Sequence, residues 1–377
     1  MAHSIVSCHR LLDVIGQIES DQRIQVVFTV GPDAFNKHVE RYLNSIGALV
    51  VPWLQAVRER FDLAVAASYG GLHQLHAPLL VMAHGAGHGK RVRPGRHGGP
   101  KISEPPVYGL DAQRLVHGGR VLPTALALAH DHELDVLRRQ CPEALDVAVV
   151  VGDPCLDRLV ASLPSRRRYR RHLGIADGES LVVVTSTWGP DGLFGRWPDL
   201  LPLLMTELSG SRHRVAALLH PAVWDAHGHR QVRSWLQDCR EAGLLLPDPT
   251  VDWRSLVVAA DRIIGDHGSV TAYAGAVGRP VLLPPDDRIP IAEGTAQDLI
   301  RTAAGRLDLH RALGPQLESV PAIDRQAVAG AITTRAGRAS VLLRRTMYRL
   351  LRLPEPGRHR QIEPLPPPVP RRWGVEG

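Results

Sequence analysis

Cysteine and aromatic residues are scarce in this chain of 377 residues, and it has no long apolar run. The four cysteines stand far apart, in neither metal-binding nor redox spacing, so we expect reduced thiols and no metal site. They are Cys8, Cys141, Cys155 and Cys239. Charge follows the first residues at once, at Arg10 and Asp13, which is not the pattern of a signal peptide. With no stretch long enough to span a bilayer either, the sequence predicts a cytoplasmic protein.

The chain is mildly basic. Its 45 lysines and arginines exceed its 38 aspartates and glutamates, which gives a formal net charge of +7. This charge permits a polyanionic partner without requiring one, because a nucleotide donor or an anionic polymer satisfies it as well as nucleic acid does. The densest basic run, residues 166–171, is typical of a polyanion-binding surface or of a solvated helix face. We favour the solvated face and expect no nucleic-acid partner.

The length of the chain predicts two domains. In both halves, apolar runs of strand length alternate with helical patterns. Near-continuous apolar strands indicate parallel sheets covered on both faces, so we expect two doubly wound α/β domains that face each other across a cleft. The predicted strands are residues 23–30, 49–51, 61–67, 78–82, 122–128, 147–151, 181–185, 214–219, 262–264 and 280–283.

The beginning of the chain is unusual for this fold class. A helical pattern starts at residues 11–18, although a doubly wound domain normally opens on a central strand. Residues 1–6 are barely long enough for that strand. Two alternatives stay open: the first strand is very short, or the natural protein begins upstream of Met1.

Composition sets the predicted domain limits. We expect the first α/β domain at residues 1–151, the second at 152–323, C-terminal helices at 324–354 and a proline-rich, disordered tail at 355–377. The helical pattern at 339–353 carries arginines on one face and leucines on the other. Such a helix packs across its own domain or makes a peripheral membrane contact.

A glycine- and histidine-rich loop, predicted at residues 85–106, directly follows the apolar strand 78–82. At its start lie His84 and Lys90, where a parallel strand opens onto the expected cleft. There an imidazole can act as a general base and a lysine can meet a phosphate, although both are also common loop residues. His88 stands four residues after His84, but the glycines between them argue against a metal-binding helix.

The second candidate is the turn at residues 266–269, between a short apolar strand and a helical pattern. The unpaired N–H groups and positive dipole end of a helix N-terminus favour a phosphate there. Gly268 permits close backbone approach, and Ser269 or Thr271 can add a hydroxyl donor. An ordinary capped turn is the alternative.

Two further strand ends of the second domain carry polar residues. His220 precedes Pro221 after the strand 214–219, and Thr187 follows the strand 181–185. Each alone is typical of a strand-terminating turn. Together with His84 and the turn at Asp266, they converge on the edges of one expected cleft.

These segments, in this order, resemble the CDP-glycerol glycerophosphotransferase family, which builds teichoic-acid-type cell-wall polymers on a two-domain GT-B scaffold. The matching segments are residues 84–90, 152–159, 173–175, 185–188, 220–221, 266–269 and 278–281. The resemblance implies that His84 is the base and that His220 holds the donor pyrophosphate. The sequence departs from the family pattern at Ala83, Gly189 and His267, so the identity of the substrate stays open.

The sequence therefore predicts a transferase that uses an activated nucleotide donor, CDP-glycerol or a nucleotide sugar, and no metal or other cofactor. The acceptor would be a hydroxyl group, on an anionic polymer or another molecule. His84 is the predicted base, and the donor would be bound by the second domain with help from the first; the predicted donor-binding residues are Lys90, Thr187, His220, Asp266, Gly268, Ser269 and Thr271. A nucleotide-sugar epimerase-like enzyme and a non-catalytic nucleotide-binding protein are the alternatives.

Overall fold

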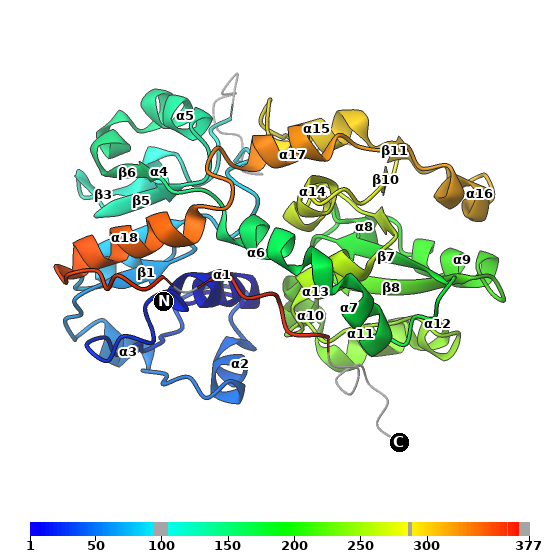
Figure 1. The fold of residues 1–377 in the computed structure, drawn as a ribbon, viewed down its shortest axis with the longest axis horizontal. Helices are drawn as coiled ribbons and strands as arrows, with labels where there is room; N and C mark the ends of the chain where they lie inside the picture. Colours follow the sequence, from blue (N-terminus) through cyan, green and yellow to red (C-terminus); the bar gives the residue numbers. More distant parts are fainter. Residues whose placement is uncertain (93–104, 286–288, 360, 369–377) are drawn as a thin grey trace. The chain divides into compact units, whose positions relative to one another are not determined.

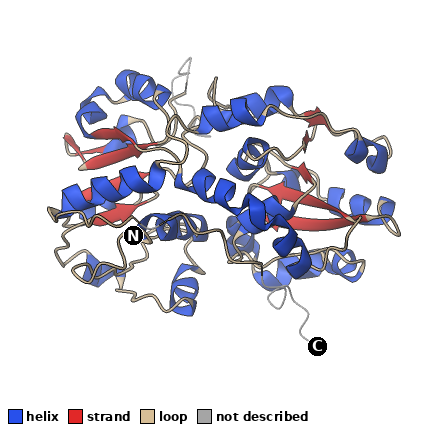
Figure 2. Cartoon of the chain, viewed as in Figure 1, coloured by secondary structure: helices blue, strands red, loops and turns tan. Residues whose placement is uncertain are grey.

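A computed structural model of the chain describes residues 1–92, 105–285, 289–359 and 361–368 (Figures 1 and 2). Most of the long loop predicted at 85–106 lies outside these residues. The chain forms two compact units. Unit 1 comprises Met1–Asp157, Pro290–Thr295 and Gly330–Ile362, and unit 2 comprises Arg158–Ile289, Ala296–Ala329 and Glu363–Gly377. No helix in the described ranges is long and apolar enough to cross a membrane.

Unit 1 is built on a parallel sheet with the strand order β1-β2-β5-β6. Its strands are β1 (Ala64–Ala66), β2 (Leu79–Met82), β5 (Ala125–Leu128) and β6 (Ala148–Val150), and a small antiparallel pair is formed by β3 (Val116–His117) and β4 (Arg120–Val121). Its helices are α1 (Ile5–Ile15), α2 (Val39–Ser45), α3 (Trp53–Ala56), η1 (Leu72–Gln74), α4 (Ala112–Leu115), α5 (His132–Gln140), η2 (Pro142–Val147) and α18 (Ala339–Leu351).

Both faces of the unit 1 sheet are covered, as apolar strands predict. Because side chains alternate along a strand, Leu80 and Met82 of β2 enter one core cluster, while Leu79 and Val81 enter another. The first cluster includes buried residues of α1 and α18. Leu343 and Met347 of α18 are at most 1% exposed. The leucine face of this helix therefore packs on its own unit, and its membrane contact stays a prediction.

The strand predicted at residues 23–30 is wrong for most of its length. Only its end is paired, through single parallel bridges between Ala2 and Val30 and between Phe28 and Val50. Ala2 thus occupies the place of a very short strand beside β1, and the amino group of Met1 donates to the Val65 carbonyl at 2.8 Å. The apolar residues before Phe28 lack a neighbouring strand, which explains why the prediction fails there.

Unit 2 contains a five-stranded parallel sheet with the order β11-β10-β9-β7-β8. Its strands are β7 (Ser180–Ser186), β8 (His213–Leu219), β9 (Arg262–Ile264), β10 (Val281–Leu283) and β11 (Gly305–Arg306). Its helices are η3 (Leu163–Ser165), α7 (Arg166–His172), α8 (Leu193–Arg196), α9 (Leu200–Glu207), α10 (Pro221–His227), α11 (His229–Trp235), α12 (Gln237–Glu241), α13 (Trp253–Ala259), α14 (Ser269–Ala276), α15 (Ala296–Ala303) and α16 (Leu313–Glu318), while α6 (Pro154–Ser162) and α17 (Arg325–Ile332) cross the unit boundaries.

The strand order of unit 2 indicates where on its sheet a ligand would bind. The chain passes from β7 to β8 on one side and later returns to β9 on the other side of β7. In open α/β sheets, ligands bind at the carboxyl ends of the strands where the order reverses in this way. The end of β7, at Thr187, lies at this position.

The arginine run is not simply a solvated helix face. Arg170 lies 2.6 Å from Asp261, and Arg166 forms an ion pair with the same carboxylate. Both arginines are partly buried, and Asp261 also accepts the backbone N–H of Leu181 at the start of β7. These two arginines therefore tie α7 to the sheet.

The proline-rich tail is ordered in part, which corrects the prediction of disorder at residues 355–377. Leu365 is 3% exposed, and its carbonyl accepts the Tyr169 hydroxyl at 2.7 Å. Its N–H donates to the Ser162 hydroxyl at 3.0 Å. Composition predicts disorder from proline content, but it cannot reveal one leucine that fits a core; residues 369–377 lie outside the described residues.

Candidate functional site

The predicted donor-binding residues of unit 2 gather at the carboxyl edge of its sheet. Asp266, after β9, joins the ends of two neighbouring strands. One of its oxygens accepts the N–H of Thr187 at 2.7 Å, the Thr187 hydroxyl at 2.8 Å and the N–H of Leu193 at 3.0 Å. The other accepts the N–H of Gly268 at 2.9 Å. Asp266 and Thr187 are buried, so they hold the shape of the edge.

The turn after Asp266 leads directly into α14. Gly268 is the N-cap of this helix, and no side chain caps it. A side chain at Gly268 is excluded, because a Cβ atom would lie 2.8 Å from the Thr187 methyl group and 3.0 Å from Asp266 Oδ1. Ser269, the first residue of the helix, is partly exposed. The first helical N–H groups and the Ser269 hydroxyl can therefore meet an anion.

Thr271 does not share this orientation. It is 1% exposed, and its hydroxyl faces the backbone of Gly265, where a Cβ atom would approach it to 2.4 Å. No hydrogen bond to this hydroxyl is present among the described residues. An anion at the start of α14 is therefore out of its reach as the side chain is placed.

His220 completes the edge from the neighbouring strand. Its backbone N–H donates to Ser186 at the end of β7 at 3.0 Å. Its ring Nδ1 accepts the N–H of Ala222 at 3.1 Å and so caps α10. Because Nδ1 acts as an acceptor, the proton of the neutral ring is on Nε2. His220 thus presents an N–H donor, the group that a phosphate oxygen requires.

His84 lies in unit 1, directly after β2, and its side chain is exposed to solvent. Its Nδ1 lies 2.8 Å from the carbonyl oxygen of Ala67. A carbonyl only accepts, so Nδ1 carries the proton and Nε2 is an acceptor. Desolvation by the surrounding protein lowers the pKa of His84, and the charges of Arg10 and Lys90 act in the same direction, against the bond to Ala67. The positive charges of Arg10 and Lys90 disfavour a second proton on the ring, so the neutral base is the favoured form.

Two buried groups that the sequence analysis missed hold the His84 loop. Arg10 of α1 donates to the carbonyl of Gly85 at 2.9 Å and to the carboxylate of Asp153 at 3.1 Å. The side chains of this ion pair are 3% and 2% exposed. Arg10 and Asp153 stand 143 residues apart, so no local pattern links them.

The second holding group fixes the loop at His88. Glu133 accepts both the backbone N–H of His88 at 2.9 Å and its ring Nδ1 at 2.8 Å, while Nε2 lies 3.1 Å from the Tyr69 hydroxyl. Burial raises the pKa of Glu133, but the attraction of His88 and these hydrogen bonds outweigh it and lower it to about 2. His88 therefore serves the loop's structure. Lys90 ends the loop with an exposed side chain, and its backbone forms an antiparallel bridge with Ile291.

The structure thus sorts the predicted residues into two groups. His84 and Lys90 share one loop of unit 1, and the remaining six belong to one edge of unit 2. Within that edge, His220 and Ser269 are partly exposed, Gly268, Thr187 and Asp266 are buried beneath them, and Thr271 points inward. Among the described residues, no group of three or more histidines, cysteines, aspartates or glutamates has a metal-binding arrangement.

Comparison with solved structures finds a similar fold in the wall teichoic acid polymerase TagF. A TagF variant soaked with CDPG for 30 minutes gives a TM-score of 0.61 at 14% identity, over 93% of this chain and 86% of that chain. The TagF structure itself gives 0.56 at 14% identity, over 93% and 85%. In another TagF variant structure, the match covers 58% of that chain.

No family model and no curated protein sequence matches the chain. At this low identity, the likeness to TagF concerns the fold. The chain has a GT-B-like α/β fold similar to that of TagF, which confirms the fold expected from the resemblance to the glycerophosphotransferases.

Proposed function

We propose that the chain is a transferase that moves a glycerophosphate or glycosyl group from a nucleotide-activated donor to a hydroxyl acceptor. Unit 2 binds the donor, and unit 1 supplies the base. CDP-glycerol is the donor that the resemblance favours, and a nucleotide sugar is the second candidate. An anionic, teichoic-acid-type polymer is the favoured acceptor.

One observation carries this proposal: the two candidate histidines are held in opposite tautomers. His84 donates from Nδ1 to a carbonyl, so its Nε2 can accept a proton. His220 accepts at Nδ1 from a helix N–H, so its Nε2 can donate to a phosphate. Neither ring would serve the other's role in its neutral form.

The reaction balances with these groups. His84 Nε2 takes the proton of the acceptor hydroxyl, and the acceptor oxygen attacks phosphorus in CDP-glycerol or the sugar carbon in a nucleotide sugar. The new bond forms as the bond to the leaving phosphate oxygen breaks, and the nucleotide departs with the additional negative charge. Stabilisation of that charge is the main electrostatic task of the site.

The edge of unit 2 offers donors for that task without a metal ion. The N–H groups at the start of α14 and the Ser269 hydroxyl follow β9, and the His220 ring follows β8; these two strands flank β7. Asp266 fixes their framework in advance, so little reorganisation is needed when charge develops. Lys90 can add a positive charge from unit 1.

Two other functions predict different behaviour. A nucleotide-sugar epimerase-like enzyme would convert its donor without an acceptor hydroxyl. A non-catalytic binding protein would bind the donor and release no nucleotide. The lowered pKa of His84 and the buried ion pair that fixes its loop favour a catalytic role.

Melting curves recorded with CDP-glycerol, UDP-glucose and GDP-mannose test the proposal, because a ligand that binds only the folded state raises its melting temperature. We expect one donor to raise it and the phosphate-free nucleosides cytidine, uridine and guanosine to leave it unchanged. Nucleotide release with a polyol acceptor then separates a transferase from a binding protein. No shift with any donor would contradict the proposal.

A further inference from the structure

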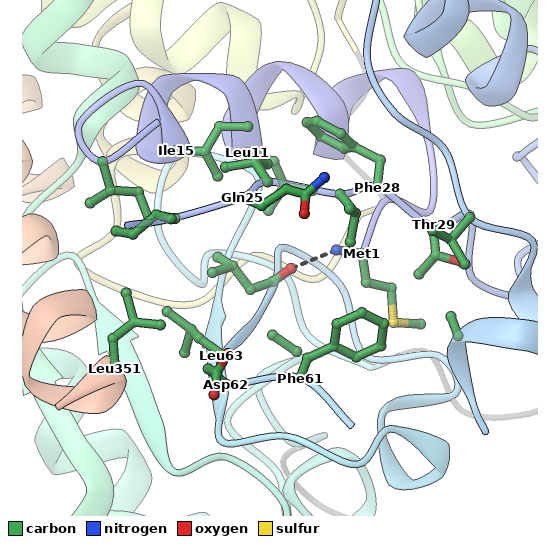
Figure 3. A pocket seen from close by; sticks show the side chains of 18 of the residues that line it. Met1, Leu11, Ile15, Gln25, Phe28, Thr29, Phe61, Asp62, Leu63 and Leu351 are labelled. Atoms are coloured by element: carbon green, nitrogen blue, oxygen red, sulfur yellow. Dashed lines mark hydrogen bonds between the residues drawn. The ribbon is translucent and has the colours of Figure 1, made fainter. Parts of the chain in front are cut away.

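An apolar trench lies in unit 1 beside the amino group of Met1, and nothing in the proposed reaction uses it. Its volume is about 350 Å³. Figure 3 shows Leu11 and Ile15 of α1 on one side of this space and Leu63 and Leu351 on the opposite side. Two stretches of the chain, residues 23–29 and 61–65, supply most of its lining and form its walls.

Both walls continue segments that are paired as sheet. At one end of the trench, Phe28 exchanges hydrogen bonds with residues 49 and 51 at 2.8 and 2.7 Å, and Ala2 donates to Thr29 at 2.8 Å. On the other wall, Val65 accepts from the Met1 amino group. Within the trench this pairing stops. Among the described residues, the backbone N–H groups of Gln25, Val27 and Leu63 have no hydrogen-bond acceptor, and the alternation along each wall turns them toward the trench.

These residues are exposed or half-buried, so water can meet their N–H groups, and a strand in the trench would replace that water as it continues the sheet. The side chains of Ile24, Val26 and Leu63 are only partly buried against the core, so this region also lacks apolar cover. A ligand that fits must therefore supply carbonyl acceptors at strand spacing together with apolar side chains. An acyl chain would supply apolar contacts but no carbonyl acceptors at strand spacing.

The Met1 amino group marks where such a strand would run. It occupies the place of a strand amide, and burial lowers its pKa to about 6. Three or four extended residues at about 3.3 Å each would reach from this point along Val27 to Gln25.

We propose that the trench binds one extended apolar polypeptide segment, which lies between residues 25–27 and 63–65 and pairs with both walls. The segment adds a strand to the sheet, the mode known as β-augmentation. Because both faces of this strand would be covered, its residues are apolar throughout, with β-branched side chains favoured.

The test uses the full chain with five added residues before Met1, because a segment joined at that point has a high effective concentration in the trench. The added segment is Thr-Val-Val-Ile-Val. One control extension is Gly-Ser-Gly-Ser-Gly, which also replaces the charged amine by an amide, and a second is Val-Pro-Ile-Pro-Val, which is apolar but cannot pair as a strand. Melting temperature and amide hydrogen exchange are measured for all three.

We expect the first extension alone to raise the melting temperature by several degrees and to slow exchange at Gln25, Val27 and Leu63 at least tenfold. Equal effects of the proline-containing extension would overturn the proposal, because apolar cover without pairing would suffice. So would slowed exchange with added dodecanoate but not with the first extension, since the trench would then be a site for acyl chains.

Discussion

His84 Nδ1 lies 2.8 Å from the carbonyl oxygen of Ala67, and this contact decides which ring nitrogen can accept a proton. In His220 the corresponding nitrogen lies 3.1 Å from an N–H group instead, which reverses the assignment. The backbone next to each histidine thus sets its tautomer, and the first three predictions follow from this difference.

Replacement of His84 by alanine should lower the transfer rate by roughly a hundred- to ten-thousand-fold, as expected for a lost general base. Donor affinity should stay nearly unchanged, because His84 contacts the acceptor in the proposed reaction. His117→Ala is the matched control, since His117 is an exposed histidine of unit 1 that stacks on His73. Rates and donor binding are measured for both variants, and an unchanged rate for His84→Ala would remove its role.

The pH dependence of the rate gives a second prediction. A general base must be neutral, so the rate rises with pH through the pKa of His84. That pKa is lowered from 6.5 by desolvation and by Arg10 and Lys90. At pH 6.5 the rate should therefore exceed half of its plateau value. The His117→Ala variant should keep this acidic limb, whereas a limb centred above pH 6.5 would show that another group controls the rate.

His220 serves two tasks that two substitutions can separate. Asparagine is a good N-cap and retains the cap of α10, whereas alanine loses it at a cost of about 0.5–2 kcal/mol. Both remove the ring donor, and a hydrogen bond to a charged group contributes about 1.5–3 kcal/mol, which corresponds to roughly 10- to 150-fold in Kd. We expect His220→Asn to keep the stability and to weaken donor binding in calorimetric titration. Wild-type affinity in this variant would exclude His220 from the donor site.

Replacement of Asp266 should lower the stability of the protein even when no donor is bound. Its carboxylate accepts four hydrogen bonds, and Asp266→Ala leaves three buried N–H groups without that acceptor. We expect the free energy of unfolding in urea to fall by about 3 kcal/mol. Asp177→Ala, at an exposed aspartate in a loop of unit 2, is the control and should change it by less than about 0.5 kcal/mol. Similar losses in both variants would show that Asp266 does not hold the edge.

The strands of both units could be predicted from the sequence because burial on two faces leaves a continuous apolar run. Val182, Val183 and Val184 of β7 are at most 1% exposed, and such a run bounded by turn residues is typical of a strand in a covered parallel sheet. Residues 24–27 gave the same pattern without a neighbouring strand, and the prediction failed there. Apolar residues indicate that a segment is to be buried, but a strand also needs a neighbouring strand with which it can pair.

Of the candidate site, the sequence could predict only those residues that follow the ends of strands. His84, His220 and Asp266 each lie within two residues of a strand end, and the strand order places the latter two on either side of β7. Thr271 was expected to face a ligand, but α14 is apolar on nearly all sides and its sequence does not show which side is inside. Arg10 and Glu133 were missed because their partners lie 143 and 45 residues away.

The most direct test of the proposed function is a crystal structure of the protein with CDP-glycerol, or with whichever donor raises its melting temperature. We predict that the pyrophosphate lies within hydrogen-bond distance of the Ser269 N–H and of His220 Nε2, at the end of β7. A pyrophosphate bound away from residues 266–269 would contradict the assignment of the donor site.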